Sequence, residues 1–236
     1  MEINDLVVKG KITLVIKDYK SVCTLSGSLD IKDLVNNKLK KTNVILINDI
    51  SDLVFYELRV IDVINKFAFM YNIKGTKFIK QILKLSTLTV DYLEKDPMLL
   101  NNSEKFKLIL ALVLILNPTG IIINNMSCYL DSKSKSEVMF TLKKLRREYN
   151  KTIVIIDNGV DYFYSVCDNV IVLNNDKVIL SGKKEILFDN YMMLKRKKIS
   201  IPIYIEFVYY VKQNRDCDML VRDDVKDIMK DIYRSL

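Results

Sequence analysis

Four short runs of consecutive apolar residues constrain the fold of this chain more than any other feature of its sequence. Most residues in these runs are β-branched. The runs lie at residues 12–16, 44–47, 121–123 and 152–156. Apolar residues at every position, rather than at every second position, are typical of strands buried on both faces, as in parallel sheets covered by helices. The sequence therefore predicts an α/β domain with a parallel sheet.

Helical patterns fill the gaps between these runs. Residues 104–117 are apolar nearly all round, which predicts a buried helix that Pro118 ends. Residues 132–149 predict an amphipathic helix with Asp131 or Ser132 as its N-cap. Its apolar side chains recur at i, i+4, i+7 and i+11, namely Val138, Leu142, Leu145 and Tyr149. Strands that alternate with helices predict right-handed crossovers.

The last third of the chain predicts a β-hairpin and then a small helical unit. Residues 170–173 and 177–180 flank an Asn-Asn-Asp turn. Beyond Gly182 come a basic run at 195–198 and two amphipathic segments. The expected apolar faces comprise Ile203, Phe207, Val208 and Val211 in the first segment, and Val225, Ile228, Met229 and Ile232 in the second. A cluster of four aromatic residues in the first segment either forms an interface or packs on the chain's own α/β domain, namely Tyr204, Phe207, Tyr209 and Tyr210.

The composition excludes several classes of function. The 236 residues include no histidine, which removes histidine-based acid–base catalysis and histidine metal ligands. The six glycines are isolated from one another, so no glycine-rich loop is available to hold a phosphate. The four cysteines lie far apart, which argues against a disulfide framework and a zinc site. The net charge of +8 suits anionic partners, and no apolar run approaches the ~20 residues of a membrane-spanning helix.

Four segments between residues 100 and 182 follow one another in a specific order. They read LNNSEKFKLILALVLILNP, IIINNMSCYLDSKS, KTIVIIDN and VCDNVIVLNNDKVILSG. This order resembles the second half of an ATP-binding-cassette (ABC) ATPase. In that family a signature loop opens a helix ending in Asn-Pro, and a Walker B strand, a Ser-x-Leu-Asp loop, a helix, a strand ending in a switch histidine and a hairpin follow. Residues 187–232 resemble the C-terminal extension of the A components of energy-coupling factor (ECF) transporters, the vitamin and metal importers of prokaryotes.

The resemblance implies an α/β fold with an ABC-ATPase-like parallel sheet, a helical subdomain and a small helical C-terminal extension. We expect a degenerate ATP-binding-cassette domain at 1–182, which contains the helical subdomain at roughly 55–105, and the extension at 183–236. The resemblance also implies a cytoplasmic protein that is peripheral on the inner face of the cell membrane.

The positions that carry the chemistry of the family are altered in this chain. The resemblance places Asn124 where the Walker B aspartate holds Mg²⁺ waters, Asn125 where the catalytic glutamate orients the attacking water, and Asn158 where the switch histidine lies. Phosphoryl transfer depends almost entirely on positioning and on electrostatic stabilisation of the metal and the developing charge. A neutral amide neither accepts a proton nor satisfies a hard cation as a carboxylate does. We therefore expect no catalytic residue and no metal site.

The phosphate-binding positions of the family are altered as well. No GxxxxGK[ST] string occurs, and only Lys20 and Ser21 stand where the Lys-Ser/Thr pair of the family would fall. The resemblance places Asp49, or a neighbouring residue, where the family has its Q-loop glutamine. The signature loop corresponds to Asn101, Asn102 and Ser103, for which capping of the following helix is the better interpretation. These residues are at most a vestigial nucleotide site, so we expect no cofactor. If any nucleotide binding survives, its ligands would be ATP and Mg²⁺.

One family element is well preserved. The segment Cys-Tyr-Leu-Asp at 128–131 matches the Ser-x-Leu-Asp loop, which crosses the dimer seam in the family. The resemblance therefore implies that Tyr129, Leu130 and Asp131 lie at such a seam, while Asp131 serves at the same time as a helix cap.

The catalytic and phosphate-binding positions of the family are altered, whereas the order of its structural segments is preserved. The sequence therefore predicts a catalytically degenerate ECF-like ATP-binding subunit, which would be a non-hydrolysing partner in a transporter complex. Its partners would be another cassette ATPase subunit, in a homodimer or a heterodimer, and a transmembrane coupling protein. No specific nucleic acid is expected. One alternative is a cassette-derived scaffold that binds protein or nucleic acid through its basic surface. Another alternative is an active but divergent transporter ATPase.

Overall fold

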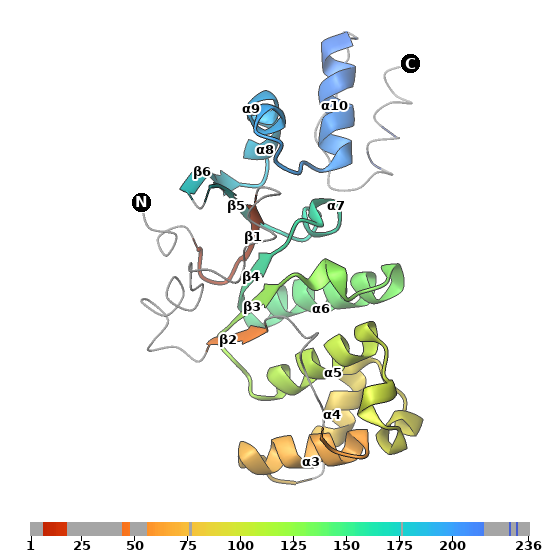
Figure 1. Ribbon diagram of the computed structural model, residues 1–236. Coiled ribbons are helices and arrows are strands. Elements are labelled where there is room, and N and C mark those ends of the chain that lie inside the picture. Colours follow the sequence, from red (N-terminus) through yellow and green to blue (C-terminus); the bar gives the residue numbers. More distant parts are fainter. Residues whose placement is uncertain are drawn as a thin grey trace.

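The computed structural model describes residues 7–17, 44–47, 56–75, 77–175 and 177–214, with Asp227 and Lys230 beyond them. The strands in this part of the chain are β1 (Ile12–Lys17), β2 (Val44–Ile47), β3 (Gly120–Asn124), β4 (Thr152–Ile156), β5 (Asn169–Asn174) and β6 (Lys177–Lys183). Within the described ranges they form one six-stranded sheet in the order β2-β3-β4-β1-β5-β6 (Figure 1). Strands β1 to β5 are parallel, and β6 pairs with β5 in the antiparallel sense.

The parallel sheet that the apolar runs predict is confirmed. Alternate residues of β1 belong to different cores, because successive side chains of a strand point to opposite faces. Ile12, Leu14 and Ile16 lie in the main hydrophobic core, whereas Val15 lies in a second cluster on the other face. All six residues of β1 are buried, which is why the run carries no polar alternation.

The helices lie around and beyond this sheet. They are α3 (Val60–Met70), α4 (Lys77–Ser86), α5 (Asn102–Ile115), α6 (Ser132–Tyr149), α7 (Val160–Phe163), α8 (Ile186–Asp189), α9 (Tyr191–Arg196) and α10 (Ile203–Asn214), and three 3₁₀ turns lie at Val90–Glu94, Pro97–Leu99 and Met126–Cys128. In Figure 1 the helices α3, α4 and α5 lie beyond the β2 edge of the sheet, and α8, α9 and α10 lie beyond its β6 edge. None of the described helices is long and apolar enough to cross a membrane.

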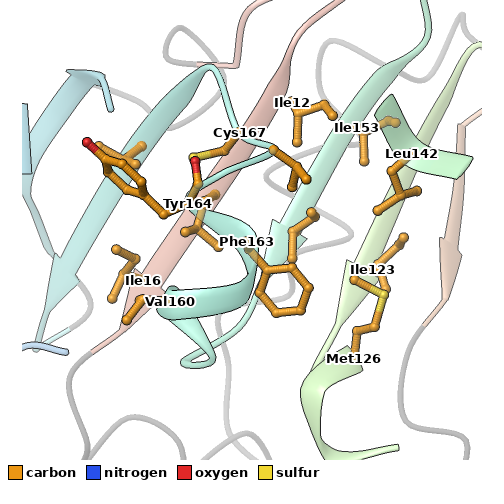
Figure 2. Close-up of a cluster of buried hydrophobic side chains, with 14 of the residues drawn as sticks. Ile12, Ile16, Ile123, Met126, Leu142, Ile153, Val160, Phe163, Tyr164 and Cys167 are labelled. Atoms are coloured by element: carbon orange, nitrogen blue, oxygen red, sulfur yellow. The ribbon is translucent and has the colours of Figure 1, made fainter. Parts of the chain in front are cut away.

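Two of the helical regions are held in different ways. Helices α3 and α4 bury their apolar faces against α5 in a core of their own, which includes Val60, Ile64, Phe78, Ile82 and Leu108. The main core joins the sheet to the other side of α5, to α6 and α7, and to the helices after β6. Figure 2 shows side chains of β1, β3 and β4 gathered against Val160 and Phe163 of α7 and Leu142 of α6. The domain boundaries expected near 55–105 and at 182 remain predictions.

The predicted helices and hairpin are present with shifted ends. Helix α5 begins at Asn102 rather than 104 and ends at Ile115, and Asn117 follows in a left-handed conformation with φ of 50°. Helix α6 has the predicted bounds and takes Asp131 as its N-cap. Its last residue, Tyr149, is 59% exposed, so its place on the predicted apolar face is wrong. Strands β5 and β6 form the hairpin, and β6 continues to Lys183.

The apolar face predicted for the first segment of the extension is partly wrong. Ile203 is 69% exposed and Phe207 is 42% exposed, whereas Tyr204, Ile205 and Val208 are buried. The Tyr204 ring packs edge-on against Tyr164, with 5.3 Å between the ring centroids. Helix α10 therefore turns a different side toward the core. The apolar face predicted at 225–232 lies outside the described residues.

Candidate functional site

The three asparagines to which the resemblance assigns catalytic positions, Asn124, Asn125 and Asn158, lie at the same end of the parallel strands. Asn124 ends β3 and lies opposite Ile156, the last residue of β4, in the parallel register. Asn158 follows two residues later, and its Oδ1 accepts a hydrogen bond from the backbone N–H of Lys17 at 3.4 Å. Lys17 is the last residue of β1. The carboxyl ends of parallel strands are where α/β proteins bind their ligands, so the sheet brings Asn124 and Asn158 to the expected edge.

Asn124 and Asn125 have different environments. The Asn124 side chain is 5% exposed, so a neutral amide is buried at the end of β3. Asn125 has left-handed backbone angles, φ 52° and ψ 35°, and its N–H donates to the Ile156 carbonyl at 2.9 Å. Asparagine tolerates this conformation better than most residues. Asn125 therefore also suits the local backbone of the loop after β3.

A buried carboxylate that the sequence interpretation did not single out lies beside these amides. Asp157 is 4% exposed. Its Oδ2 accepts from the N–H of Ser127 at 2.7 Å, and its Oδ1 accepts from the Ser127 hydroxyl and from the N–H of Gly159 at 2.7 Å. Three donors thus engage both oxygens, and the carboxylate links the loops that follow β3 and β4.

Gly159 makes the contacts of Asp157 possible. A Cβ at Gly159 would lie 2.8 Å from the Cβ of Ser127 and 3.1 Å from Asp157 Oδ1. The sequence signal that could have identified this link is an aspartate directly after a buried strand and two residues before a glycine. Its partner, Ser127, is 30 residues away and has no such signal.

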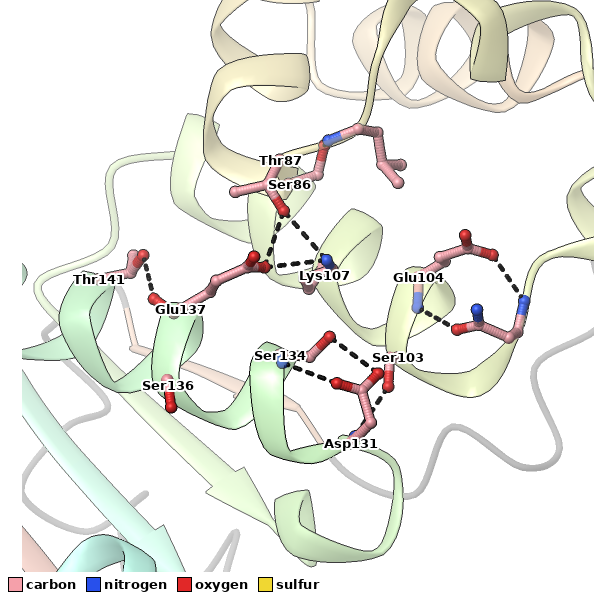
Figure 3. Close-up of polar contacts among 12 residues, drawn as sticks. Ser86, Thr87, Ser103, Glu104, Lys107, Asp131, Ser134, Ser136, Glu137 and Thr141 are labelled. Carbon is pink, nitrogen blue, oxygen red and sulfur yellow. Dashed lines mark hydrogen bonds and ion pairs between the residues drawn. The ribbon is translucent and has the colours of Figure 1, made fainter.

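The positions of the signature loop cap their own helix. Asn101 Oδ1 accepts from the N–H of Glu104 at 2.9 Å, and Glu104 Oε2 accepts from the N–H of Asn101 at 2.9 Å, which forms a capping box. The other carboxylate oxygen of Glu104 accepts from the Tyr92 hydroxyl at 2.6 Å, and this hydrogen bond raises the pKa of Tyr92. Figure 3 shows Glu104 at this end of α5. The capping interpretation is confirmed for Asn101.

Ser103 joins the start of α5 to the loop before α6. Its hydroxyl donates to the Tyr129 carbonyl and accepts from the N–H of Asp131, both at 3.0 Å. Asp131 in turn accepts from the N–H of Ser134 at 2.8 Å. This backbone hydrogen bond, followed by the hydroxyl of Ser103, lowers the pKa of Asp131 to about 2.

The three residues predicted for a dimer seam differ in exposure. Leu130 is 5% exposed and belongs to the main core of the chain. Tyr129 is half-buried, and its ring stacks on Phe106 with 6.4 Å between centroids. Asp131 is exposed. Any seam at this loop would therefore present Asp131 and part of Tyr129 rather than the Leu130 side chain.

Part of the predicted nucleotide site cannot be placed. Lys20, Ser21 and Asp49 lie outside the described residues. Among the residues that the structure does describe, no group of three or more cysteine, aspartate or glutamate side chains is arranged to hold a metal ion.

The sheet order, with a second core formed by α3, α4 and α5, matches the fold of solved ATP-binding cassettes. CbiO1 of Clostridium perfringens, part of the ABC transporter complex CbiONQ, superposes with a TM-score of 0.59 at 19% identity, over 88% of this chain and 89% of that chain. The cassette MJ0796, solved as a dimer with ADP and Pi, gives a TM-score of 0.59 at 18% identity, over 75% of this chain and 87% of that chain.

Similar sequences carry ABC transporter names. A protein of Pyrococcus horikoshii described as an ABC transporter ATP-binding protein is 28% identical over 66% of this chain and 55% of its own length. The ECF transporter ATP-binding protein EcfA2 of Enterococcus faecalis is 29% identical over 57% of this chain and 46% of its own length. No family model matches the chain.

The homologues of this chain are thus ABC transporter ATP-binding proteins, and they include ECF A components. The resemblance noted in the sequence is confirmed. The chain spans about half the length of the curated relatives it matches.

Proposed function

We propose that this chain is an ECF-like cassette subunit that does not hydrolyse ATP. The observation that carries the proposal is the pair Asn124-Asn125 at the carboxyl end of β3, where the resemblance places an aspartate and a glutamate. The metal-binding carboxylate and the water-orienting carboxylate are both replaced by neutral amides. Because phosphoryl transfer relies on charge stabilisation at these points, their replacement removes the main catalytic contribution of the strand.

The neighbouring carboxylate is a poor substitute for the missing ones. Asp157 already accepts hydrogen bonds from Ser127 and Gly159 through both oxygens. To take a metal ion or a proton from water, it would have to release these donors in a buried place, and unsatisfied buried donors cost about 1–3 kcal/mol each. Asp157 is therefore better suited to fixing the loops than to catalysis.

The start of α5 is also poorly suited to a phosphate. A helix N-terminus attracts anions through its N–H groups and its dipole. Here the Glu104 carboxylate already occupies this end and would repel a second anion. The proposal therefore extends to the signature loop, whose residues Asn101 to Ser103 serve structural contacts.

The partners we propose are a second cassette subunit and a transmembrane coupling protein, with this chain peripheral on the cytoplasmic face of the membrane. Support comes from relatives named as ECF transporter ATP-binding proteins and from a similar cassette solved as a dimer. An intact cassette partner would supply the hydrolysis that this chain lacks.

A phosphate-release assay with purified full-length chain and Mg-ATP tests the proposal. We expect no release above the buffer rate, while EcfA2 of Enterococcus faecalis in the same assay serves as the positive control. Turnover that Lys20→Ala abolishes would show a working phosphate site and would contradict the proposal. Contaminating ATPase is distinguished by turnover that Lys20→Ala leaves unchanged.

A further inference from the structure

A cavity of about 580 Å³ opens among the three helices of the extension (α8, α9 and α10, near the top of Figure 1). Its lining comprises Asp189, Asn190, Met192, Met193, Arg196, Lys197 and Tyr209. The volume falls within the range of roughly 300–1,000 Å³ that is typical of small-ligand sites. None of these residues takes part in the edge of the sheet described above.

The apolar wall of the cavity is fixed by aromatic packing. The Tyr209 ring stacks on Tyr191 at 4.2 Å and meets Phe188 edge-on at 6.0 Å. Met192 and Met193 complete this wall, and Met192 is 46% exposed. Methionine side chains are unbranched and polarizable, so they adapt to apolar groups of different shape.

A polar bridge holds α9 against α10 beside the cavity. Glu206 accepts from Lys195 at 2.7 Å and from the Tyr191 hydroxyl at 2.8 Å. The Lys195 contact, and then that of Tyr191, lowers the pKa of Glu206 and keeps it charged. Since Lys195 is engaged in this bridge, the basic run at 195–198 divides into a structural lysine, two cations that line the cavity, and Lys198, which is not among the lining residues.

Opposite charges line this cavity without neutralising one another. Among the described residues, Asp189 forms no ion pair with Arg196 or Lys197, and neither cation has another acidic partner. All three side chains are exposed. Unpaired charges of both signs beside an apolar wall are complementary to a ligand that carries both charges on an apolar body.

We infer that this cavity binds a short apolar peptide with a free amine and a free carboxylate. The carboxylate of the ligand contacts Arg196 and Lys197, its ammonium group contacts Asp189, and its apolar side chains lie against Met192, Met193 and Tyr209. Arginine suits the carboxylate because its guanidinium donates two parallel hydrogen bonds. The inference is independent of whether the cassette binds or hydrolyses ATP.

Isothermal titration of the full-length chain with the tripeptide Leu-Phe-Leu tests the inference. We expect saturable binding of one peptide per chain, weakened about tenfold by acetylation of the amine or amidation of the carboxylate, the order expected for the loss of one charge-assisted contact. These peptide variants need no change in the protein. An absence of saturable binding up to millimolar peptide would overturn the inference.

Protein variants assign each end of the peptide. Arg196→Gln should weaken the free peptide but not the amidated one, and Asp189→Asn should weaken the free peptide but not the acetylated one. Lys198→Gln and Glu185→Gln are matched controls, because both residues are exposed and lie outside the cavity lining. If the controls weaken binding as much as the cavity variants do, the attraction is a general charge effect and the inference is wrong.

Discussion

Asparagine takes five of the seven left-handed positions that non-glycine residues hold in the described part of the chain. They are Asn72, Asn117, Asn125, Asn150 and Asn175. Asparagine visits this region more readily than other side chains because its short amide hydrogen-bonds locally. In a chain with six glycines, asparagine therefore supplies turns that glycine often supplies. Asn125 serves as a turn residue at the position where our proposed function has it replace a carboxylate.

Restoring the carboxylates is not expected to restore hydrolysis. In Asn124→Asp with Asn125→Glu, a metal and water site would return, but the sequence still lacks a glycine-rich loop to hold the phosphates. Glutamate at the left-handed position should cost about 1 kcal/mol, and should lower the melting temperature by about 2–4 °C. Phosphate release and thermal unfolding measure the two effects, with Asn124→Asp alone as the control. Hydrolysis well above wild type would mean that a phosphate site had been overlooked.

Asp157 should matter for stability rather than for chemistry. Asp157→Asn replaces an acceptor of three hydrogen bonds by an amide whose nitrogen faces donors. We expect the free energy of unfolding to fall by about 2 kcal/mol or more, as for other lost hydrogen bonds to buried charges. Urea denaturation measures the change. Asp91→Asn, at an exposed position in a 3₁₀ turn, is the control and should change stability by less than about 0.5 kcal/mol.

Between elements, polar contacts fix α5 against α6 at two points (Figure 3). Ser103 holds the loop of Tyr129 and Asp131, and one turn further along α5 Lys107 pairs with Glu137 of α6 at 3.1 Å. Lys107 also donates to Thr87, just after α4, at 3.0 Å. These contacts connect the helical core of α3 to α5 with the sheet-bearing part of the chain, and they add to the apolar packing of Phe106, Leu110 and Val113 of α5 in the main core.

The Asp131 cap predicts a specific dependence of stability on pH. Its pKa is lowered from 3.8 to about 2 in the folded chain, so the charged form stabilises the fold above pH 3.8, and this contribution is lost as the pH falls toward 2. Between pH 4 and 2, wild type should therefore lose stability more steeply than Asp131→Asn does. Urea midpoints at several pH values check this. Parallel curves for the two proteins would mean that the cap does not shift the carboxyl group.

For the whole molecule, the sheet was predictable because the apolar runs are short and rich in β-branched residues, which favours strands buried on both faces over a buried helix. The side of α10 that packs on the core was not predictable, because Ile203 and Phe207 form as regular an apolar stripe as Tyr204 and Val208. Contacts with residues distant in the sequence select between them, among them the contact of Tyr204 with Tyr164, 40 residues away. The Asp157–Ser127 and Tyr92–Glu104 contacts were missed for the same reason: each depends on two segments that meet only in the folded chain.

The extension should be part of the core and an exposed surface at the same time. Leu187, Leu194 and Ile205 are fully buried in the cluster that contains the sheet residues, so truncation after Gly182 would expose the main core and should cause aggregation. A chain that stays folded and soluble after truncation would contradict this role in the core.

Point variants separate the core from the surface. Ile205→Ala should lower the free energy of unfolding by about 2–5 kcal/mol, because Ile205 is fully buried. Phe207→Ala should leave the free energy of unfolding within about 0.5 kcal/mol of wild type, because Phe207 is exposed beside the buried Val208. If the outward side chains Phe207 and Tyr210 meet a second cassette subunit, Phe207→Ala should still weaken co-elution with that subunit in size-exclusion chromatography. Unchanged co-elution would place the contact with the partner elsewhere, and a large loss of stability in Phe207→Ala would mean that this ring belongs to the core.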